Sequence, residues 1–229
     1  MSGVGTVLFN LAVRPDNGKV FVSNTEARNQ VRFEPVLRGH VVENRITVLD
    51  GAVARPVNLN PHIDYRVTPG TAEEIERSLA LPMGMAFARD GTRLYVAAFG
   101  SAKVAVLDPD ALEAGRVTGE QIPVGLGPSG VVLDEARQRL YVMNRIDHTI
   151  SVVSTATRTQ TTAVSVGHDP SPPEVRNGRR FLYDARTSSG HGDAACGSCH
   201  VFGDFDSLAW DLGDPYGTLR TATPSSRVS

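Results

Sequence analysis

The sequence has little of what marks several large classes of protein. Its 229 residues include only 2 Cys, which is too few for a disulfide framework. No run approaches the roughly 20 apolar residues that a membrane-spanning helix needs, so we expect no membrane span. The 23 Lys and Arg balance 25 Asp and Glu to a formal net charge of −2, and no basic stripe stands out. We therefore expect no nucleic-acid partner.

The N-terminus lacks the features of an export signal. A signal peptide begins with a basic region followed by an apolar stretch, whereas residues 1–10 lead directly into strand-like sequence. What the chain does have is 28 Val together with 22 Gly and 14 Pro. β-Branched residues favour strands, and Gly and Pro favour the turns between them. The composition therefore predicts a mainly β protein, and the chain is long enough to bury a substantial core.

An internal repeat gives these strands an order. Segments that start at residues 82, 93 and 103 recur without a gap at residues 128, 139 and 149, an offset of 46. Each unit reads as four strands, and a looser copy precedes them with insertions at 25–43 and 61–80, the second of which holds a short helical patch at 73–79. We expect strands at 10–15, 19–24, 44–50 and 55–59; at 84–89, 93–99, 103–108 and 116–124; and at 130–134, 139–144, 149–154 and 159–166.

Four strands in a period of 40 to 50 residues are typical of a β-propeller blade, with a β-sandwich as the alternative. The strands Leu94-Tyr95-Val96 and Leu140-Tyr141-Val142-Met143-Asn144 resemble those of the YVTN family of β-propeller repeats, and the resemblance covers roughly residues 5–167. It implies a propeller fold and leaves the function open. Because propellers close with 4 to 8 blades, about three blades at 1–167 predict an incomplete ring and a chain that is part of a longer protein.

A second region begins after Gly167. The Pro-rich linker 168–173 cannot pair as a central strand, and it precedes a predicted helix at 174–183 with Phe181 and Leu182 as apolar anchors. We therefore expect residues 174–229 to form a small α-helical segment that follows the partial propeller.

The two cysteines lie in this region, in the motif Cys196-Gly-Ser-Cys199-His200, which is the attachment motif for c-type haem. Two thiols three positions apart lie on one face of a helical turn, where each can form a thioether with the porphyrin, and His200 can then ligate the iron. The alternatives are a thioredoxin-like dithiol, a zinc site and a structural pair without a cofactor. The dithiol lacks a βαβ context, and a zinc site lacks four convergent ligands, with only His191 left nearby.

The residues around the motif resemble the first haem-binding segment of the di-haem cytochrome c peroxidase family. The resemblance rests on Gly178-Arg-Arg-Phe-Leu-Tyr-Asp184, the loop at 188–190 and the motif itself, and it covers about residues 174–203. It implies a cytochrome c-like fold in which Phe181 and Leu182 pack against the haem edge. A propeller joined to such a segment also resembles large exported bacterial proteins of the propeller-cytochrome type.

The sequence departs from an electron-transfer cytochrome on the far side of the iron. The sixth ligand is usually a Met or His downstream of the motif, and residues 201–229 contain neither. We interpret Met85 and Met143 as core residues, and we expect His191 on the proximal side of the haem or in solvent.

The stretch after the motif carries two further candidates. Trp210 is expected to pack on the porphyrin, whose plane offers a large apolar area. The acidic segment 204–214 could gather a calcium ion, but its spacing does not fit an EF-hand loop, so a solvated acidic loop is favoured.

These patterns predict a protein that binds one covalent haem c through Cys196, Cys199 and His200 and transfers single electrons, with the haem carried after a β-propeller scaffold. The alternatives are a peroxidase of the di-haem type whose second haem is absent from this chain, and a surface recognition propeller. The redox partner and any small-molecule ligand are left open. Because covalent haem attachment in bacteria takes place outside the cytoplasmic membrane, we expect a periplasmic or extracellular protein.

Overall fold

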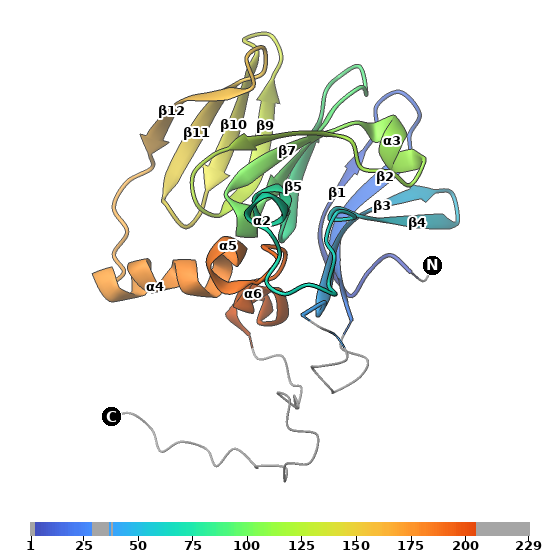
Figure 1. The fold of residues 1–229 in the computed structure, drawn as a ribbon. Helices are drawn as coiled ribbons and strands as arrows, with labels where there is room; N and C mark the ends of the chain where they lie inside the picture. Colours follow the sequence, from blue (N-terminus) through green and yellow to red (C-terminus); the bar gives the residue numbers. More distant parts are fainter. Residues whose placement is uncertain (1–2, 29–36, 38, 205–229) are drawn as a thin grey trace, which may run out of the picture.

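The computed structural model of the chain describes residues 3–28, 37 and 39–204. Three four-stranded antiparallel sheets, each built from strands consecutive in the chain, lie side by side (Figure 1). The first sheet holds β1 (Val7–Val13), β2 (Val20–Ala27), β3 (Val42–Asp50) and β4 (Val53–Asn58). The second holds β5 (Pro82–Phe87), β6 (Leu94–Ala98), β7 (Lys103–Leu107) and β8 (Gly119–Pro123), and the third holds β9 (Pro128–Asp134), β10 (Arg139–Asn144), β11 (Thr149–Ser154) and β12 (Thr159–Ser165).

The sheets are arranged as the blades of a partial propeller, which confirms the predicted fold class. The first strands of the three blades, β1, β5 and β9, are neighbours, so each sheet turns the same edge towards a common centre. Every predicted strand overlaps an observed one, and the last three agree to within one residue. Strand positions therefore follow from the repeat and the turn residues alone.

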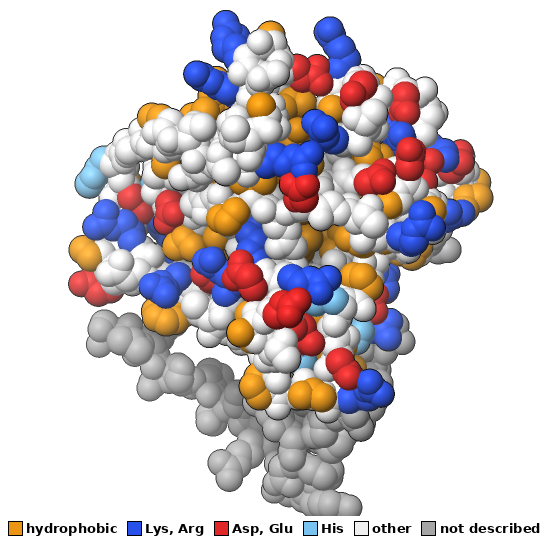
Figure 2. All heavy atoms as spheres, turned by 45° about the horizontal axis from the view of Figure 1, so that its top comes forward, with side chains coloured by type: hydrophobic (Ala, Val, Ile, Leu, Met, Phe, Trp, Pro, Cys, Tyr) orange, Lys and Arg blue, Asp and Glu red, His pale blue; other side chains and the backbone are white. Residues whose placement is uncertain are grey.

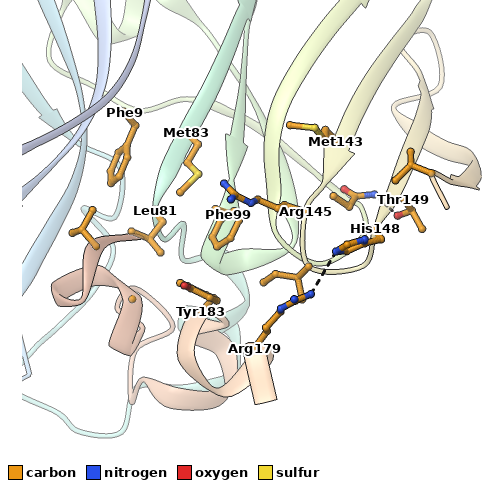
Figure 3. A pocket seen from close by; sticks show the side chains of 15 residues that line it. Phe9, Leu81, Met83, Phe99, Met143, Arg145, His148, Thr149, Arg179 and Tyr183 are labelled. Atoms are coloured by element: carbon orange, nitrogen blue, oxygen red, sulfur yellow. Dashed lines mark hydrogen bonds between the residues drawn. The ribbon is translucent and has the colours of Figure 1, made fainter. Parts of the chain in front are cut away.

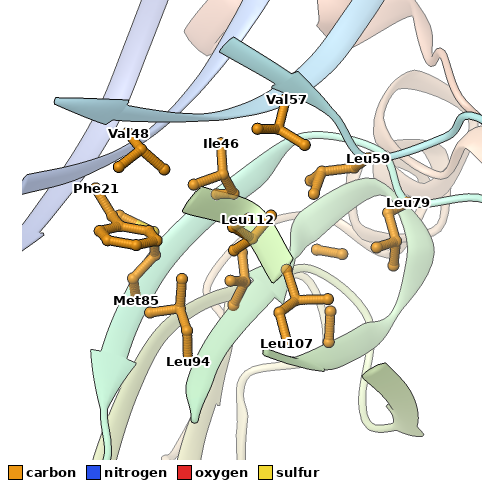
Figure 4. Packing of buried hydrophobic residues seen from close by; sticks show 13 residues of the cluster. Phe21, Ile46, Val48, Val57, Leu59, Leu79, Met85, Leu94, Leu107 and Leu112 are labelled. Atoms are coloured by element: carbon orange, nitrogen blue, oxygen red, sulfur yellow. The ribbon is translucent and has the colours of Figure 1, made fainter. Parts of the chain in front are cut away.

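Apolar side chains fill the space between neighbouring blades. Successive residues of a strand point to opposite faces of the sheet. The middle blade therefore presents one apolar set to the first blade and another to the third. The first interface is centred on Phe21, Ile46, Val48, Leu94 and Leu107 (Figure 4). The second contains Tyr95, Val104, Val106, Ile122, Leu140, Val142 and Val153.

The hairpin between the first two strands of each blade needs a residue in the left-handed region. Gly18 and Gly91 occupy this position in the first two blades, with φ of 73° and 72°. Gln138 occupies it in the third blade, with φ of 51°. A side chain costs about 1 kcal/mol there, so the third blade keeps the turn without the residue that favours it.

Helices α2 and α3 lie within the described propeller part of the chain. Helix α2 (Ala72–Arg77) forms in the predicted patch, and Thr71 caps it by accepting a hydrogen bond from Glu74 N–H. Helix α3 (Pro109–Glu113) is not among the predicted elements. Its local signal is the pair Asp108-Pro109, in which Asp108 caps the first turn and Pro109 supplies a preset φ.

Helix α3 ties the second blade to the first through charge. Arg14 Nη1 lies 2.7 Å from Asp110 Oδ1 and 2.6 Å from Glu113 Oε1, and Lys19 Nζ lies 2.5 Å from Glu113 Oε2. Burial by itself raises the pKa of Glu113, but hydrogen bonds from Lys19, Asn17 and Arg14 outweigh it and lower this pKa to about 2. The carboxylate therefore stays charged and keeps α3 bound to the first blade at the edge of the interface.

The remaining described helices lie together at one end of the blades (Figure 1). They are α4 (Pro173–Tyr183), α5 (Ala185–Ser188), α6 (Cys196–Cys199) and the 3-10 turn η2 (Val201–Gly203), with a further 3-10 turn, η1 (Phe99–Ser101), in the second blade. Ala80, Ala185 and Ala195 form a buried cluster where α5 and the residue before α6 meet the chain leading into β5. Small side chains let these backbones approach closely, so the helical segment lies directly on the propeller part.

The surface carries charges of both signs. Lys and Arg side chains are interspersed with Asp and Glu over the face shown in Figure 2, in keeping with the near-zero net charge. Among the helices that the structure describes, none is long and apolar enough to cross a membrane.

Candidate haem-attachment site

The motif forms one helical turn, as its spacing predicts. Helix α6 runs from Cys196 to Cys199, and His200 ends it by donating its backbone N–H to Cys196 O at 2.9 Å. Ser198 is buried and its Oγ accepts the backbone N–H of Ala195 at 3.0 Å, which caps the turn. Cys196 is exposed, Cys199 is partly exposed, and no disulfide joins them. Both thiols are therefore on a preformed turn and within reach of a cofactor.

The imidazole of His200 has a defined orientation. Its Nδ1 lies 3.0 Å from the backbone oxygen of Asp204. A carbonyl oxygen only accepts hydrogen bonds, so Nδ1 carries the proton in this contact and the lone pair of the neutral ring is on Nε2. A backbone carbonyl on the far nitrogen is the usual arrangement of a metal-ligating histidine.

The turn packs closely on the end of α4. A Cβ built on Gly197 would lie 2.6 Å from Cδ1 of Tyr183, so only glycine fits between them without a shift. Tyr183 in turn packs edge to face against Phe99, with ring centroids 5.5 Å apart. The turn at Cys196–Cys199 thus rests on α4, and α4 rests on the second blade.

His191, five residues before Cys196, is buried at 2 % exposure, so the expectation that it could lie in solvent is wrong. Its Nδ1 lies 2.6 Å from Glu74 Oε1 of α2, and its Nε2 lies 3.3 Å from Thr68 Oγ1. The insertion at 61–80 supplies both partners. A buried imidazole has to be hydrogen-bonded, and the polar groups of this insertion satisfy it.

Asp193 forms the second half of this buried polar junction. Its Oδ2 accepts the phenol O–H of Tyr65 at 2.5 Å, and its backbone oxygen accepts Nδ2–H of Asn44 at 2.7 Å. Burial, together with the charge of Asp193, raises the pKa of Tyr65. Asn44 Oδ1 also accepts the N–H of Leu81 at 2.8 Å, so one side chain of β3 joins the chain before β5 to the loop before the motif.

Sequence reasoning misses this junction. Two of its members, Asn44 and Asp193, are 149 residues apart in the chain. Each member is an ordinary polar residue in its own segment. The signal that could have indicated the junction is the insertion at 61–80. A propeller blade does not require such an insertion, and this one carries the predicted helix that contains Glu74.

The other predicted site residues lie at different degrees of exposure. Phe181 is 64 % exposed, with the guanidinium of Arg180 5.5 Å from its ring centroid, and Leu182 is partly exposed. Their packing against a haem edge stays a prediction. Trp210 and the acidic segment 204–214, apart from Asp204, lie outside the described residues.

A cavity of about 550 Å³ lies between the blades and the helical segment (Figure 3). Gly197 and Val201 line it from the side of the motif, whereas neither thiol nor His200 does, so the cavity lies beside the candidate haem-binding residues. The blades contribute mainly apolar side chains together with Arg145 and His148; labelled residues include Phe9, Leu81, Met83, Phe99 and Met143.

The residues that line this cavity show that one of the two methionines predicted to lie in the core does not. Met85 is buried in the first interface, as expected of a core residue. Met143 is 52 % exposed and lines the cavity, so its interpretation as core filler is wrong. The physical reason is alternation along β10: Leu140, Val142 and Asn144 face the second blade, and Met143 points to the opposite face.

The linker is fixed to α4 by charge. Arg179 Nη1 lies 2.5 Å from Asp169 Oδ2, and its Nη2 donates to Ser171 Oγ at 2.6 Å. His148 Nε2 lies 3.2 Å from Asp169 Oδ2 on the other side. Hydrogen bonds from Ser171, with a further one from Arg179, lower the pKa of Asp169. The start of the helical segment is therefore held at the cavity wall.

Comparison with known proteins gives information on the fold alone. No protein-family model matches the chain, and no curated protein matches it in sequence. Among solved structures it is similar to hydrazine synthase of Kuenenia stuttgartiensis, with 21% identity, 67% of this chain and 46% of that one covered, and a TM-score of 0.53. The likeness is one of fold.

Two other solved structures are similar at a lower level. A nidogen/laminin complex has 13% identity, with 70% of this chain and 48% of that one covered and a TM-score of 0.45. U3-55K has 15% identity, 73% and 42% covered, and a TM-score of 0.46. The chain thus spans less than half the length of the structures it resembles. Within the described residues, no group of three or more His, Cys, Asp or Glu could hold a metal ion by itself.

Proposed function

We propose that the chain binds one covalent haem c at Cys196, Cys199 and His200 and that this haem transfers single electrons. The observation that carries the proposal is the orientation of His200, whose Nδ1 is hydrogen-bonded to a backbone carbonyl on the same turn that bears both thiols. In the neutral ring this contact puts the lone pair on Nε2, the atom that would ligate the iron. When bound, the haem supplies a one-electron couple at its iron, and the protein supplies orientation and electrostatics.

The residues present fit such a group. A zinc ion would require four convergent ligands, whereas two thiols and one imidazole on a single turn are the complete set by which a c-type haem is held on its proximal side. The capped turn, the close approach of Gly197 to Tyr183 and the buried contacts of Asp193 hold these three groups before any cofactor arrives. Preorganisation of this kind lowers the cost of placing the ligand.

The chemistry also bears on where the protein works. Covalent haem attachment in bacteria takes place outside the cytoplasmic membrane, so the proposal includes a periplasmic or extracellular site for the mature protein.

The test is expression of the full chain together with the haem c maturation machinery. We expect one haem per chain that survives denaturation and gives a pyridine haemochrome spectrum. The double variant Cys196→Ala/Cys199→Ala should carry none. His200→Ala should change the axial-ligand bands, whereas His168→Ala, an exposed histidine outside the motif, should leave the spectrum unaltered.

Two results would contradict the proposal. One is the absence of covalent haem from the unaltered chain, and the other is its survival in the double cysteine variant. Reversible one-electron reduction of the attached haem supports electron transfer. Peroxide turnover above that of free haem would favour the peroxidase alternative.

A further inference from the structure

The insertion at 61–80 contacts the loop before the motif through its main chain. The amide of Gly70 donates to the backbone oxygen of Gly190 at 2.8 Å. Gly192 has a φ of 73°, and a Cβ built on it would lie 2.7 Å from the backbone oxygen of Ile75. Glycine allows both this backbone conformation and this close approach. The insertion and the loop are therefore packed directly on one another.

Two side chains of the insertion bind the same loop. Glu74 Oε1 lies 2.6 Å from His191 Nδ1, and Tyr65 donates its phenol O–H to Asp193 Oδ2 at 2.5 Å. A carboxylate oxygen accepts hydrogen bonds, so Nδ1 of His191 carries the proton in the first contact. His191 is 2 % exposed and Asp193 is 1 % exposed. At such positions a lost partner leaves a buried polar group unsatisfied, which makes each contact costly to remove.

The ring of Tyr65 also joins this loop to the first blade. It stacks on His40, with ring centroids 4.0 Å apart and an interplanar angle of 8°. It meets His191 edge to face at 4.9 Å. His40 lies just before β3, so the first blade, its insertion and the loop before the motif all contact one aromatic ring.

The loop that these contacts fix leads directly to the first thiol. Residues 191–195 are buried or half-buried, and Cys196 is the first exposed residue after them. Ala195 packs with Ala80 and Ala185, and its amide donates to Ser198 Oγ inside α6. The course of this buried loop therefore decides where α6 begins and where its thiols lie relative to the blades.

We infer that Glu74 and Tyr65 are positioning residues for the haem. They act through His191 and Asp193, which fix the point at which α6 presents its two thiols and the imidazole of His200. This role rests on the proposed function. A haem attached at α6 takes its orientation from that turn, and ligand orientation and burial are among the means by which a protein sets the potential of a haem iron.

The first measurement is hydrogen exchange in the full chain, which needs no haem. Glu74→Ala removes the acceptor of His191 Nδ1–H and should speed exchange at the amides of Gly70 and Gly192 about tenfold or more. Glu74→Gln keeps an acceptor oxygen and should recover most of the protection. Glu73→Ala removes the same charge from the same helix at a side chain 82 % exposed, and this matched control should leave exchange at both amides unaltered.

The second measurement is made on the chain that carries haem. Glu74→Ala should change the electron paramagnetic resonance g-values of the ferric haem and shift its midpoint potential, whereas Glu73→Ala should change neither. Tyr65→Phe keeps the ring but loses the donor to Asp193, and it should also change both. His191→Leu should reproduce the effect of Glu74→Ala, and adding Glu74→Ala to it should change nothing further, because both substitutions remove one contact.

The failures of the two proposals are distinguishable. A chain that takes up no covalent haem would refute the proposed function, whatever its exchange rates. Unaltered exchange in Glu74→Ala would show that this contact does not hold the loop, and faster exchange with unaltered g-values and potential would show a structural role alone. Either result in a chain that carries haem would overturn the positioning role, as would a further change in the double variant.

Discussion

The blades pack through apolar side chains that recur at equivalent positions of each sheet, whereas the helical segment at 173–204 is attached by contacts that occur once: a polar junction, a cluster of small residues and the packing of Tyr183 on Phe99. Phe21 of the first blade has counterparts in Tyr95 and Tyr141. Asn44 joins β3 to Asp193, and no residue at the equivalent position of the other two blades takes part in this junction. A repeated apolar interface spreads its stabilisation over many positions, while a unique polar junction depends on each of its members.

The largest expected effect tests the apolar side of this comparison. Phe21→Ala removes a fully buried ring from the first interface, which should lower the free energy of unfolding by about 3–5 kcal/mol in chemical denaturation. Phe181→Ala, which removes the same ring from a 64 % exposed position, should change it by less than about 0.5 kcal/mol in the protein without haem. Equal effects of the two substitutions would contradict the assigned core.

Next in size is the loss of the polar junction. Asn44→Ala leaves the buried carbonyl of Asp193 and the buried N–H of Leu81 without this partner, which should cost about 3 kcal/mol. Hydrogen exchange should also speed up in the loop at 189–195 before it does in β10. The control is Asn177→Ala on the exposed side of α4, and a comparable loss in that variant would speak against a special role for Asn44.

Two glycines of the helical segment give a matched pair of smaller effects. Gly197→Ala forces a Cβ against the ring of Tyr183 and should cost about 2 kcal/mol by overpacking. Gly178→Ala meets nothing within 4 Å inside α4 and should instead stabilise by about 0.5–1 kcal/mol through helix propensity. Thermal unfolding of the two variants should therefore shift in opposite directions, and a shared direction would refute the packing of α6 on α4.

The smallest effect concerns charge between the blades. The folded pKa of Glu113 is about 2, below its ordinary 4.5, so its stabilisation is complete above pH 4.5 and is lost as the pH falls towards 2. Glu113→Gln should remove this part of the pH dependence and cost about 1 kcal/mol at pH 7. Glu73→Gln, at a carboxylate 82 % exposed, should keep the acid limb of the stability curve as it is.

Much of the fold could be predicted because its signals are local. The offset of 46 residues locates the second and third sheets, the looser copy before them locates the first, and the helical pattern after the linker 168–173 locates α4. Helix α3 escapes the strand pattern, although its Asp-Pro start is legible in the sequence. Strand period and turn chemistry involve neighbours in the chain, which is why they can be read without a structure.

The candidate site shows the same division between features that depend on local sequence and features that depend on distant segments. Cys196, Cys199 and His200 were identified from spacing, since a helical turn fixes their relation whatever surrounds it. The positions of His191 and Met143 were not, because each depends on partners from distant segments: Glu74 for the first, and the face of β10 that the second blade leaves open for the other.

The sequence by itself determined the blades, their number of strands and the helical turn at Cys196–Cys199, because hydrophobic period, turn residues and motif spacing act over a few residues. Only the tertiary structure decided that Asn44 and Tyr65 hold Asp193 and that Glu74 holds His191. Contacts between segments more than 100 residues apart depend on how whole sheets and helices pack, and no local pattern specifies that packing.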